Sequence, residues 1–538
     1  MPVAADGYAP RCPEQILLHQ IVREQLETFP THARNRDHAC PRFVEQELRS
    51  YLRCGVLAHG FLRLRCDDCR LDRLVPFSCK RRGFCPSCGG RRMSERWRSH
   101  REASEASLRR DTAAHLVDRV LPEVPVRQWV LTLPYPLRYR CAYDARLTSG
   151  VLRAFIRSLF AELRRRAKAK RGVGRGQCGA VTFIQRFGSA LNLNVHFHTL
   201  ALDGVYELVD GAPTRFVPLP PPDASEVARV LAGTARRISR VLEARAEGDE
   251  DALARDEPLL ATLAAASLGT RIATGPQAGA RWRRLGDRVE PSDDRHDPDA
   301  SPRVPQHEGM SLHAEVAVSA RDRRHLERLC RYVARPPLAS DRLEECPDGR
   351  LALRLKTRWR DGTTHILMER RELLDRLVPL IPSPRAHQVR YYGALAPCSS
   401  VRDRIVPGPR EEPSTSPPDE PSMPSLAITQ TVPEAAGQIQ ATGRAGASDP
   451  AADAYGVPRA THRHDLTVVD EADRAAAASS PPNGRPRPRR LPWAELLQRV
   501  FEVDALRCPR SAQRRYRRFD GTDGDGRNEG CRRTGADG

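Results

Sequence analysis

Residues 191–203 read LNLNVHFHTLALD, a stretch that alternates in the way that a β-strand does. Successive side chains of a strand point to opposite faces, so His196 and His198 share one face while Phe197 lies on the other. Two neutral imidazoles on one strand are suited to binding a divalent metal ion. The alternative interpretation is that the two histidines are polar residues on a half-exposed strand.

The neighbouring residues favour the ligand interpretation. Asn192 and Asn194 share the histidine face and make it a polar stripe, whereas Leu, Val and Phe line the other face. The preceding residues 180–187 (AVTFIQRF) also alternate. We therefore expect them to pair with the histidine strand as an antiparallel partner, through a turn at residues 188–191.

The composition points to a polyanionic partner. The chain has 538 residues and a formal net charge of +20, with a pI of about 9.8. This balance favours nucleic acid, although a GC-rich coding sequence would also produce the abundant Arg, Ala, Pro and Gly. No run of about 20 apolar residues is present, so we expect no membrane-spanning segment. The first residues also lack the apolar core of a signal peptide.

Four zones follow one another along the chain. Residues 1–105 hold a cysteine cluster, and residues 106–405 mix helical stretches with strand-like ones. Residues 406–490 are dominated by Pro, Ser, Ala, Asp and Glu, so they cannot bury enough apolar surface to fold and we expect a disordered linker. Residues 491–538 begin with an amphipathic helix and continue as a tail with no packing pattern.

The second zone determines the expected fold class. Its strand-like stretches lie at residues 126–133, 180–187 and 311–319, and they are separated by helical segments. This pattern predicts an α+β protein with a central antiparallel sheet and helices packed against it.

Four cysteines of the first zone have the spacing of a zinc site. Cys66, Cys69, Cys85 and Cys88 form the pattern C-x₂-C-x₁₅-C-x₂-C, which lets two knuckles close on one tetrahedral Zn²⁺. Four thiolates leave no open position for a substrate, so we expect this zinc to be structural. The alternative is a set of ordinary reduced cysteines. Two further residues are possible additional zinc ligands: Cys54 and Cys79.

A basic run lies directly before the second knuckle. Lys80, Arg81 and Arg82 would be presented by the zinc fold to the phosphates of a nucleic acid. We therefore predict that the first zone contacts DNA.

A tyrosine is expected on a helix of the second zone. In residues 322–334 (DRRHLERLCRYVA), apolar residues recur at i, i+3, i+4 and i+7 and predict one buried stripe. At 100° per residue Tyr332 falls off this stripe, beside His325 and Arg328. The alternative interpretation is a surface tyrosine that covers the flank of the helix.

Taken together, these segments resemble the HUH-class single-strand transposases of the insertion sequence 91 and common-region group, named after a His-hydrophobe-His motif. The resemblance covers most of residues 40–405. It is carried by SCKRRGFCPSC, VLTLPYPLRYR, FGSALNLNVHFHTLALDGVY, SLHAEVAV with LCRYVARPPLA, LKTRWRDGTTHILM and VRYYGALAP.

The resemblance implies an HUH nuclease domain at 106–405, after the zinc-binding domain, that cleaves and rejoins single-stranded DNA at element ends. The histidine pair would hold Mg²⁺ or Mn²⁺, and Tyr332 would attack the scissile phosphate to give a 5′-phosphotyrosine and a free 3′-OH. No nucleotide cofactor is required. A cytoplasmic, nucleoid-associated bacterial protein is implied as well. Three arginines would contact the DNA backbone or the developing charge: Arg328, Arg331 and Arg335.

This chain departs from the family pattern at three places. Many relatives carry a second tyrosine four residues before the nucleophile, where this chain has Arg328, so it resembles the single-tyrosine branch. Two histidines are too few for a hexacoordinate metal, and His313 is preferred over Gln185 as third ligand, although it could equally be a hydrogen-bonded core histidine. Where relatives end in a Cys-Pro-x-Cys knuckle, Ser511 replaces the second cysteine, which puts activity in the cell in question.

Other interpretations stay open at this point. Tyr391 and Tyr392 are less suited as nucleophiles, because VRYYGALAP reads as a strand or loop. A plasmid-type replication initiator or relaxase shares the same chemistry. A non-catalytic, zinc-dependent DNA-binding regulator would use the zinc and the arginines, with the histidines incidental.

Overall fold

The computed structural model describes residues 12–29, 40–66, 72–94, 113–209, 212–245, 251–285, 305–359, 361–407 and 516–519. Three predictions fall outside these residues: the disordered linker beyond residue 407, the amphipathic helix that begins the last zone, and the altered knuckle around Ser511.

A sheet of seven strands forms the centre of the described structure, and its strands pair antiparallel. Two of these strands form the expected hairpin around the histidine motif, which confirms that prediction. The order across the sheet is β10 (Gln306–His307), β11 (Met310–His313), β3 (Val126–Thr132), β6 (Leu193–Leu202), β5 (Gly179–Phe187) and β16 (Val389–Gly393), with β12 (Ala317–Val318) also paired to β3.

The turn between β5 and β6 depends on two backbone positions. Leu191 has a φ of 60°, in the left-handed region, and the backbone N–H of Gly188 donates to the carbonyl of Asn192 at 2.9 Å. A Cβ at Gly188 would lie 2.2 Å from Oδ1 of Asn192, so a larger residue would force the turn to shift. This close turn sets the register in which Gln185 faces His196.

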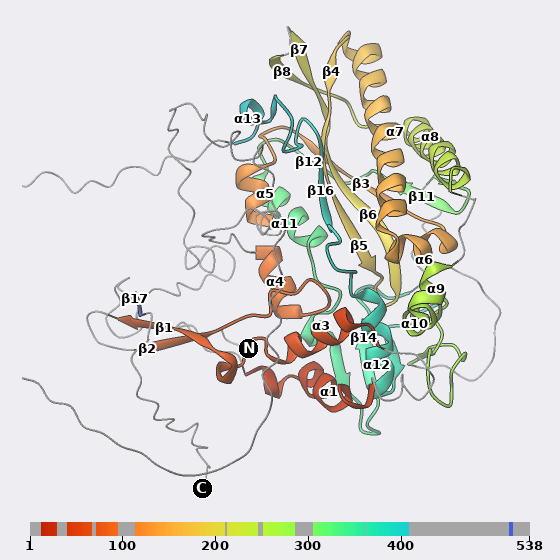
Figure 1. The fold of residues 1–538 in the computed structure, drawn as a ribbon. Helices are drawn as coiled ribbons and strands as arrows, with labels where there is room; N and C mark the ends of the chain where they lie inside the picture. The colour runs from red at the N-terminus through yellow and green to blue at the C-terminus, as the bar shows by residue number, and fades with distance from the viewer. Residues whose placement is uncertain are drawn as a thin grey trace, which may run out of the picture. The chain divides into compact units, whose positions relative to one another are not determined.

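The alternation of β6 divides the core between two faces of the sheet. Val195 and Phe197 are buried on one face, in a cluster with α6 (Tyr135–Tyr143), α7 (Ala145–Arg171) and α10 (Pro258–Leu268). Leu200 and Leu202 are buried on the histidine face, in a second cluster with α5 (Ala113–Arg119) and α11 (Arg323–Val333). Figure 1 shows α7 and α5 on opposite sides of the sheet.

Helix α11 has the buried stripe that its sequence predicts. Leu326, Leu329, Cys330 and Val333 are all buried in the cluster on the histidine face. Burial of each large apolar side chain contributes about 1.5–3 kcal/mol. The Asp322 side chain caps the helix by accepting from the backbone N–H of His325 at 2.9 Å. The stripe therefore orients the helix, and Tyr332 stays at 36% exposure.

The predicted strand 311–319 is interrupted in the structure. It forms β11 and β12, which both pair with β3, and the registers His313↔Val130 and Ala317↔Arg127 differ by one residue. Four steps on one strand opposite three on the other make a bulge, at which the carbonyl of Val316 accepts from the backbone N–H of Gln128 at 2.9 Å.

Smaller elements surround the central sheet. A three-stranded sheet contains β4 (Gly176–Gln177), β7 (Gly204–Val209) and β8 (Ala212–Pro218), and a four-stranded one contains β13 (Leu343–Glu345), β14 (Leu351–Arg354), β15 (His365–Met368) and β9 (Arg283–Arg284). Further helices in this part of the chain are α8 (Ala224–Glu243), α9 (Ala252–Asp256), α12 (Arg370–Leu377) and α13 (Arg402–Ile405).

The N-terminal part is built from helices and one hairpin. It contains α1 (Leu17–Gln25), α3 (Arg42–Leu52), the strands β1 (Phe61–Cys66) and β2 (Asp72–Pro76), and α4 (Pro86–Ser94). Buried residues such as Leu18, Leu48 and Phe84 belong to the same hydrophobic cluster as Phe197 of the central sheet. The N-terminal part thus shares a core with the sheet, and the α+β class is confirmed.

One short strand occurs in the tail for which the sequence predicts no packing pattern. β17 (Tyr516–Phe519) pairs antiparallel with β1. The edge of a two-stranded hairpin offers unpaired backbone groups to any extended segment, so such pairing requires no side-chain pattern.

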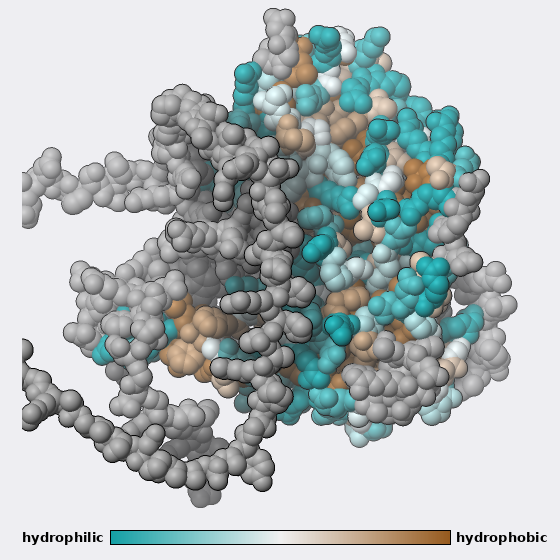
Figure 2. Space-filling view, viewed as in Figure 1, coloured by the Kyte–Doolittle hydropathy of each residue, from teal (hydrophilic) through white to brown (hydrophobic). Residues whose placement is uncertain are grey.

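Among the described residues, no helix is long and apolar enough to cross a membrane. Figure 2 shows hydrophilic side chains over much of the visible surface of these residues, with apolar ones in small groups.

Candidate active site and zinc centre

His196 and His198 converge on the histidine face of β6. Their Nε2 atoms lie 3.0 Å apart, and the outer nitrogen of each ring has its own partner. Nδ1 of His196 lies 2.9 Å from the carbonyl oxygen of Asn194, to which a protonated Nδ1 donates. Nε2 of Gln128 lies 2.7 Å from Nδ1 of His198 and donates to it in this orientation of the amide, whereas with the amide turned over its oxygen would accept an Nδ1 proton. With both Nδ1 atoms protonated, both Nε2 lone pairs are available as ligands.

The surroundings keep both imidazoles neutral. Burial, with smaller contributions from Arg335 and Arg138, lowers the pKa of His196 to about 4. Burial lowers the pKa of His198 as well, followed by repulsion from His196 and Arg335. A neutral imidazole is the form that binds a metal ion.

Gln185 lies beside the pair, on the neighbouring strand. It faces His196 directly across the β5–β6 ladder, so its side chain is on the same face of the sheet. The side chain is 4% exposed, and its Nε2 donates to the carbonyl of Val333 at 2.8 Å. Its Oε1 has no hydrogen-bond partner among the described residues. A buried oxygen of this kind is costly unless a ligand or water satisfies it.

His313 does not join the histidine pair, which corrects the preferred choice of third ligand. It pairs with Val130, which in turn pairs with His198, so His313 lies two strands, or about 10 Å, away. Its Nε2 instead lies 3.2 Å from a carboxylate oxygen of Glu315. No third histidine, cysteine or carboxylate in the described part of the chain is close enough to complete a group with the pair.

Tyr332 lies next to the histidines, between two cations. Its ring is perpendicular to that of His198, with 5.9 Å between the centroids and an interplanar angle of 85°. Nζ of Lys356 lies 4.1 Å from the tyrosine ring centroid, and Cζ of Arg335 lies 4.2 Å from it. Burial, followed by repulsion from Arg335, lowers the pKa of Lys356. The site therefore combines a phenol, two imidazoles and two cationic side chains.

The three predicted arginines of the tyrosine helix differ in position. Arg335 lies at the site, and its Nη1 is buried without a hydrogen-bond partner in the described structure. Arg331 is held by Glu327 at 2.7 Å on the same helix. Arg328 is exposed one turn before Tyr332. Tyr391 and Tyr392 lie instead on the edge strand β16, opposite Val181 and Ala180.

Lys356 and Gln128 are site residues that were not singled out from the sequence. Gln128 had no distinctive signal, since it is one of three polar residues in the stretch 126–133, with Arg127 and Thr132. Lys356 carried none, because it follows β14 in a segment of mixed polarity and reaches the tyrosine only through the fold.

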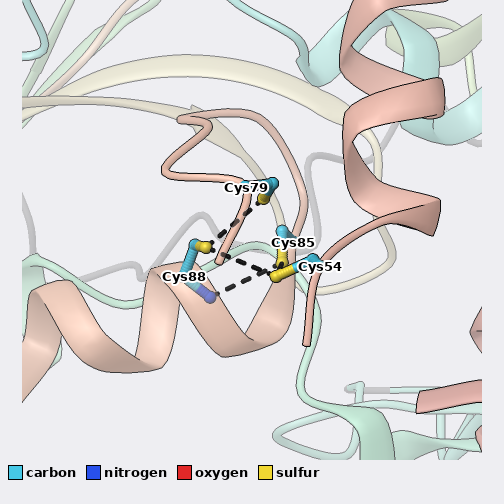
Figure 3. A group of neighbouring side chains, drawn as sticks. All are labelled: Cys54, Cys79, Cys85 and Cys88. Atoms are coloured by element: carbon cyan, nitrogen blue, oxygen red, sulfur yellow. Dashed lines mark hydrogen bonds between the residues drawn. The ribbon is translucent and has the colours of Figure 1, made fainter. Parts of the chain in front are cut away.

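Four cysteines of the N-terminal part gather in one cluster (Figure 3), namely Cys54, Cys79, Cys85 and Cys88. Their Sγ atoms all lie within 4.8 Å of one another. The Sγ–Sγ distances are 3.7 Å for Cys54–Cys88, 3.3 Å for Cys79–Cys88 and 3.6 Å for Cys54–Cys85. Four sulfurs at 2.3 Å from a common centre would be about 3.8 Å apart, so this set fits a tetrahedral zinc ion.

This quartet corrects the predicted one in two members. Cys54 and Cys79 flank the base of the β1–β2 hairpin, where the backbone N–H of Gly55 donates to the carbonyl of Phe77 at 2.9 Å. Cys66 ends β1, five residues beyond Phe61, and this length of strand spans about 16 Å. The hairpin thus carries the backbone of Cys66 away from Cys85 and Cys88. Cys69 and the side chain of Cys66 lie outside the described residues.

Residues 79–89, here called the zinc loop, hold three of the four clustered cysteines. The basic run lies in this loop and connects it to the rest of the molecule. Lys80 is exposed, with a φ of 54°. Arg81 donates from Nε to the hydroxyl of Ser50 at 3.1 Å, and Arg82 donates from Nη1 to the carbonyl of Ala386 at 3.3 Å. Only part of the predicted cluster is therefore directed toward solvent.

Comparison with known families covers both parts of the site. Residues 179–403 match the family model Y2_Tnp, described as "Putative transposase", and residues 21–107 match Zn_Tnp_IS91, described as "Transposase zinc-binding domain". No curated protein and no solved structure matches the chain. The first match contains the histidine pair and Tyr332, and the second contains the cysteine quartet, which supports a structural zinc ion there. The chain carries a zinc-binding domain followed by a transposase domain and belongs to the IS91 family of transposases, which act on DNA.

Proposed function

We propose that this transposase cleaves and rejoins single-stranded DNA at the ends of its element, through a covalent bond between Tyr332 and the 5′ phosphate of the cleaved strand. The observation that carries the proposal is the contact between Tyr332 and the histidine pair, since the two ring centroids of Tyr332 and His198 are 5.9 Å apart. A nucleophile, a pair of metal ligands and two cations meet at one place, from segments far apart in the chain.

The donor set at this place suits a divalent metal ion. His196 and His198 would hold it through Nε2, and Oε1 of Gln185, which faces His196 across the ladder, would supply a third ligand. Oδ1 of Asn194, on the histidine face of β6, is also buried without a hydrogen-bond partner among the described residues. An amide oxygen is a ligand that Mn²⁺ and Mg²⁺ accept, and neutral imidazole is a common ligand of divalent first-row metals. When bound, Mg²⁺ or Mn²⁺ would polarise the scissile phosphate.

The remaining side chains would perform the transfer. The phenol oxygen of Tyr332 attacks the phosphorus, a new O–P bond forms, and the bond from phosphorus to the 3′ oxygen breaks. The 3′ oxygen leaves as a hydroxyl with a proton, and the phenol gives up its own proton. Lys356 and Arg335 offset the negative charge that develops during this exchange. Attack by a 3′-OH on the phosphotyrosine reverses the step and rejoins a strand.

The other two interpretations fit less well. A replication initiator or relaxase would use the same residues, but both family matches are to transposase models. A non-catalytic regulator would not require a buried and a half-buried histidine, both neutral, against a tyrosine that lies between two cations. The single-tyrosine mechanism itself remains a prediction, based on Arg328 at the position of the second tyrosine.

A covalent-adduct assay tests the proposal. The full chain is incubated with a labelled single strand from an element end, with Mn²⁺ or with EDTA, and then denatured and separated by electrophoresis. We expect a labelled protein band with Mn²⁺ only, and none with the same sequence as a duplex.

Tyrosine variants make the assay specific. Tyr332→Phe removes the nucleophile and should abolish the adduct, whereas Tyr391→Phe and Tyr392→Phe should retain it. An adduct formed by Tyr332→Phe would show that another residue is the nucleophile. If the wild-type protein forms no adduct with Mn²⁺, Mg²⁺ or any other divalent ion, this result contradicts the enzymatic role.

A further inference from the structure

A cavity adjoins the proposed active site on the side away from β6. It is enclosed by the zinc loop, by the end of β5, by the turn that follows the tyrosine helix and by the start of β16. Gln185 and Arg335 line both this cavity and the proposed active site. Because these two side chains belong to both, the cavity borders the place where the scissile phosphate would bind.

The cavity exists because β16 covers only part of β5. The ladder between them ends at Val389↔Phe183, with one further bond from the backbone N–H of Ile184 to the carbonyl of Gln388 at 2.7 Å. Residues 185–187 therefore continue along an edge that β16 does not cover. The opposite walls are the zinc loop and the Pro336–Pro337 turn.

The zinc loop and the proline turn are packed closely. A Cβ at Gly89 would lie 2.4 Å from Cβ of Pro336, so only glycine allows the second knuckle to approach the turn. On the other side, Arg82 donates to the carbonyl of Ala386, three residues before β16. The zinc-binding domain thus supplies a wall of a cavity whose other walls belong to the transposase domain.

The lining has the chemistry of a nucleotide site. Phe187, Pro336 and Val389 provide apolar surface, and Arg82 and Arg335 provide positive charge. Cζ of Arg335 lies 5.7 Å from the ring centroid of Phe187, and its Nη1 is buried without a partner among the described residues. No acidic residue occurs among those that line the cavity. A flat apolar group joined to a phosphate would satisfy both features, since bases stack on such side chains and phosphates bind arginine.

We propose that this cavity receives one unstacked nucleotide of the DNA strand, next to the scissile phosphate. Its base would lie against Phe187 and Pro336, and its phosphate would face Arg335 and Arg82. This inference rests on the proposed function and adds that the zinc-binding domain helps to select the cleavage position, because its own loop forms part of the base-binding site.

An abasic scan tests the inference without requiring cleavage. The full chain with Tyr332→Phe is titrated, with Mn²⁺ present, with fluorescent single strands from an element end, each carrying one tetrahydrofuran abasic residue in place of a nucleotide. Loss of the accommodated base should weaken binding at one position on the order of tenfold, since stacking of one base is worth about that factor or more. Its neighbours should change much less.

Variants locate this effect in the cavity. Ala334→Phe and Val389→Trp fill the cavity from two different walls. In either variant, the intact strand should bind no more tightly than the strand that is abasic at the sensitive position. Arg236→Gln is the matched control, because it removes an exposed positive charge on α8, on the other side of the sheet. Far-UV circular dichroism and thermal unfolding identify any variant that fails to fold.

The outcomes separate the inference from the proposed function. If wild-type protein forms the Tyr332 adduct but the scan shows no single sensitive position, or if that sensitivity survives in both filled variants, the nucleotide site is disproved and the cleavage mechanism stands. Unchanged affinity of Arg82→Ala for every strand of the scan would mean that this arginine does not contact the DNA, which also overturns the inference. Failure of the adduct itself would instead overturn the proposed function.

Discussion

The cysteine quartet and the histidine pair differ in how many chain segments each requires and in how closed each site is. The quartet takes one residue from the turn that follows α3, one from the loop after β2, and two from the residue before α4 and the first turn of α4, and it leaves no open position. The histidine pair comes from one strand, and on the same face the side-chain oxygens of Gln185 and Asn194 are buried without a hydrogen-bond partner among the described residues. A closed four-thiolate site suits a structural ion, whereas an incomplete set leaves room for a substrate.

The largest expected difference concerns stability. Replacing Cys54 or Cys79 by Ser should abolish zinc binding and lower the unfolding temperature by more than about 10 °C, because the binding free energy of a structural zinc contributes directly to folding. Zinc content by mass spectrometry and thermal unfolding measure both effects. Cys398→Ser is the control, because Cys398 is exposed and outside the cluster.

The same measurement separates the two possible quartets. Cys66→Ser and Cys69→Ser should retain the zinc ion of the cluster if its ligands are those that the structure brings together. Zinc loss in these two variants with retention in Cys54→Ser and Cys79→Ser would restore the grouping that the C-x₂-C spacing predicts.

At the histidine pair we expect the opposite behaviour. His196→Ala should reduce adduct formation by a factor on the order of 10³, because it removes a ligand of an ion that contributes several kcal/mol to the transition state. Its unfolding temperature should stay within a few degrees of wild type, since His196 is only half-buried and its truncation removes little packed apolar surface. Single-turnover kinetics and thermal unfolding are measured together. A large loss of stability would mean that the pair is structural.

A smaller effect is expected at the third ligand. Gln185→Leu should raise the Mn²⁺ concentration needed for half-maximal adduct yield by about 10- to 100-fold, because it removes a metal ligand. Gln185→Glu should leave this concentration close to that of wild type, because a carboxylate also supplies an oxygen ligand. A titration of adduct yield against Mn²⁺ concentration provides the measurement. His313→Leu is the matched comparison, and a stronger effect there than at Gln185 would contradict the arrangement of the site.

The smallest effect is expected for the cation beside the tyrosine. Lys356→Met should slow adduct formation roughly tenfold, because one of two charges near the reacting oxygen is lost while Arg335 remains. Lys356→Arg should recover most of the rate. If both variants react as fast as wild type, Lys356 has no role in the transfer.

Local patterns predicted much of the fold and part of the site. The alternation of residues 191–203 placed His196 and His198 on one face, and the stripe in residues 322–334 placed Tyr332 outside the core. Both predictions depend only on the repeat of a strand or a helix, which neighbouring residues determine. The interruption of the predicted strand 311–319 was missed, because a bulge depends on the partner strand.

The sequence by itself therefore determined the class of the fold, the histidine pair, the helix that carries Tyr332 and the presence of a zinc-binding cysteine set. Only the tertiary structure decided which cysteines gather, that Gln185 rather than His313 lies beside the histidines, and that Lys356 and Arg335 flank the tyrosine. The physical reason is the range of the interactions. Backbone periodicity acts over a few residues, whereas the length of a hairpin and the order of strands bring together segments that no local spacing relates.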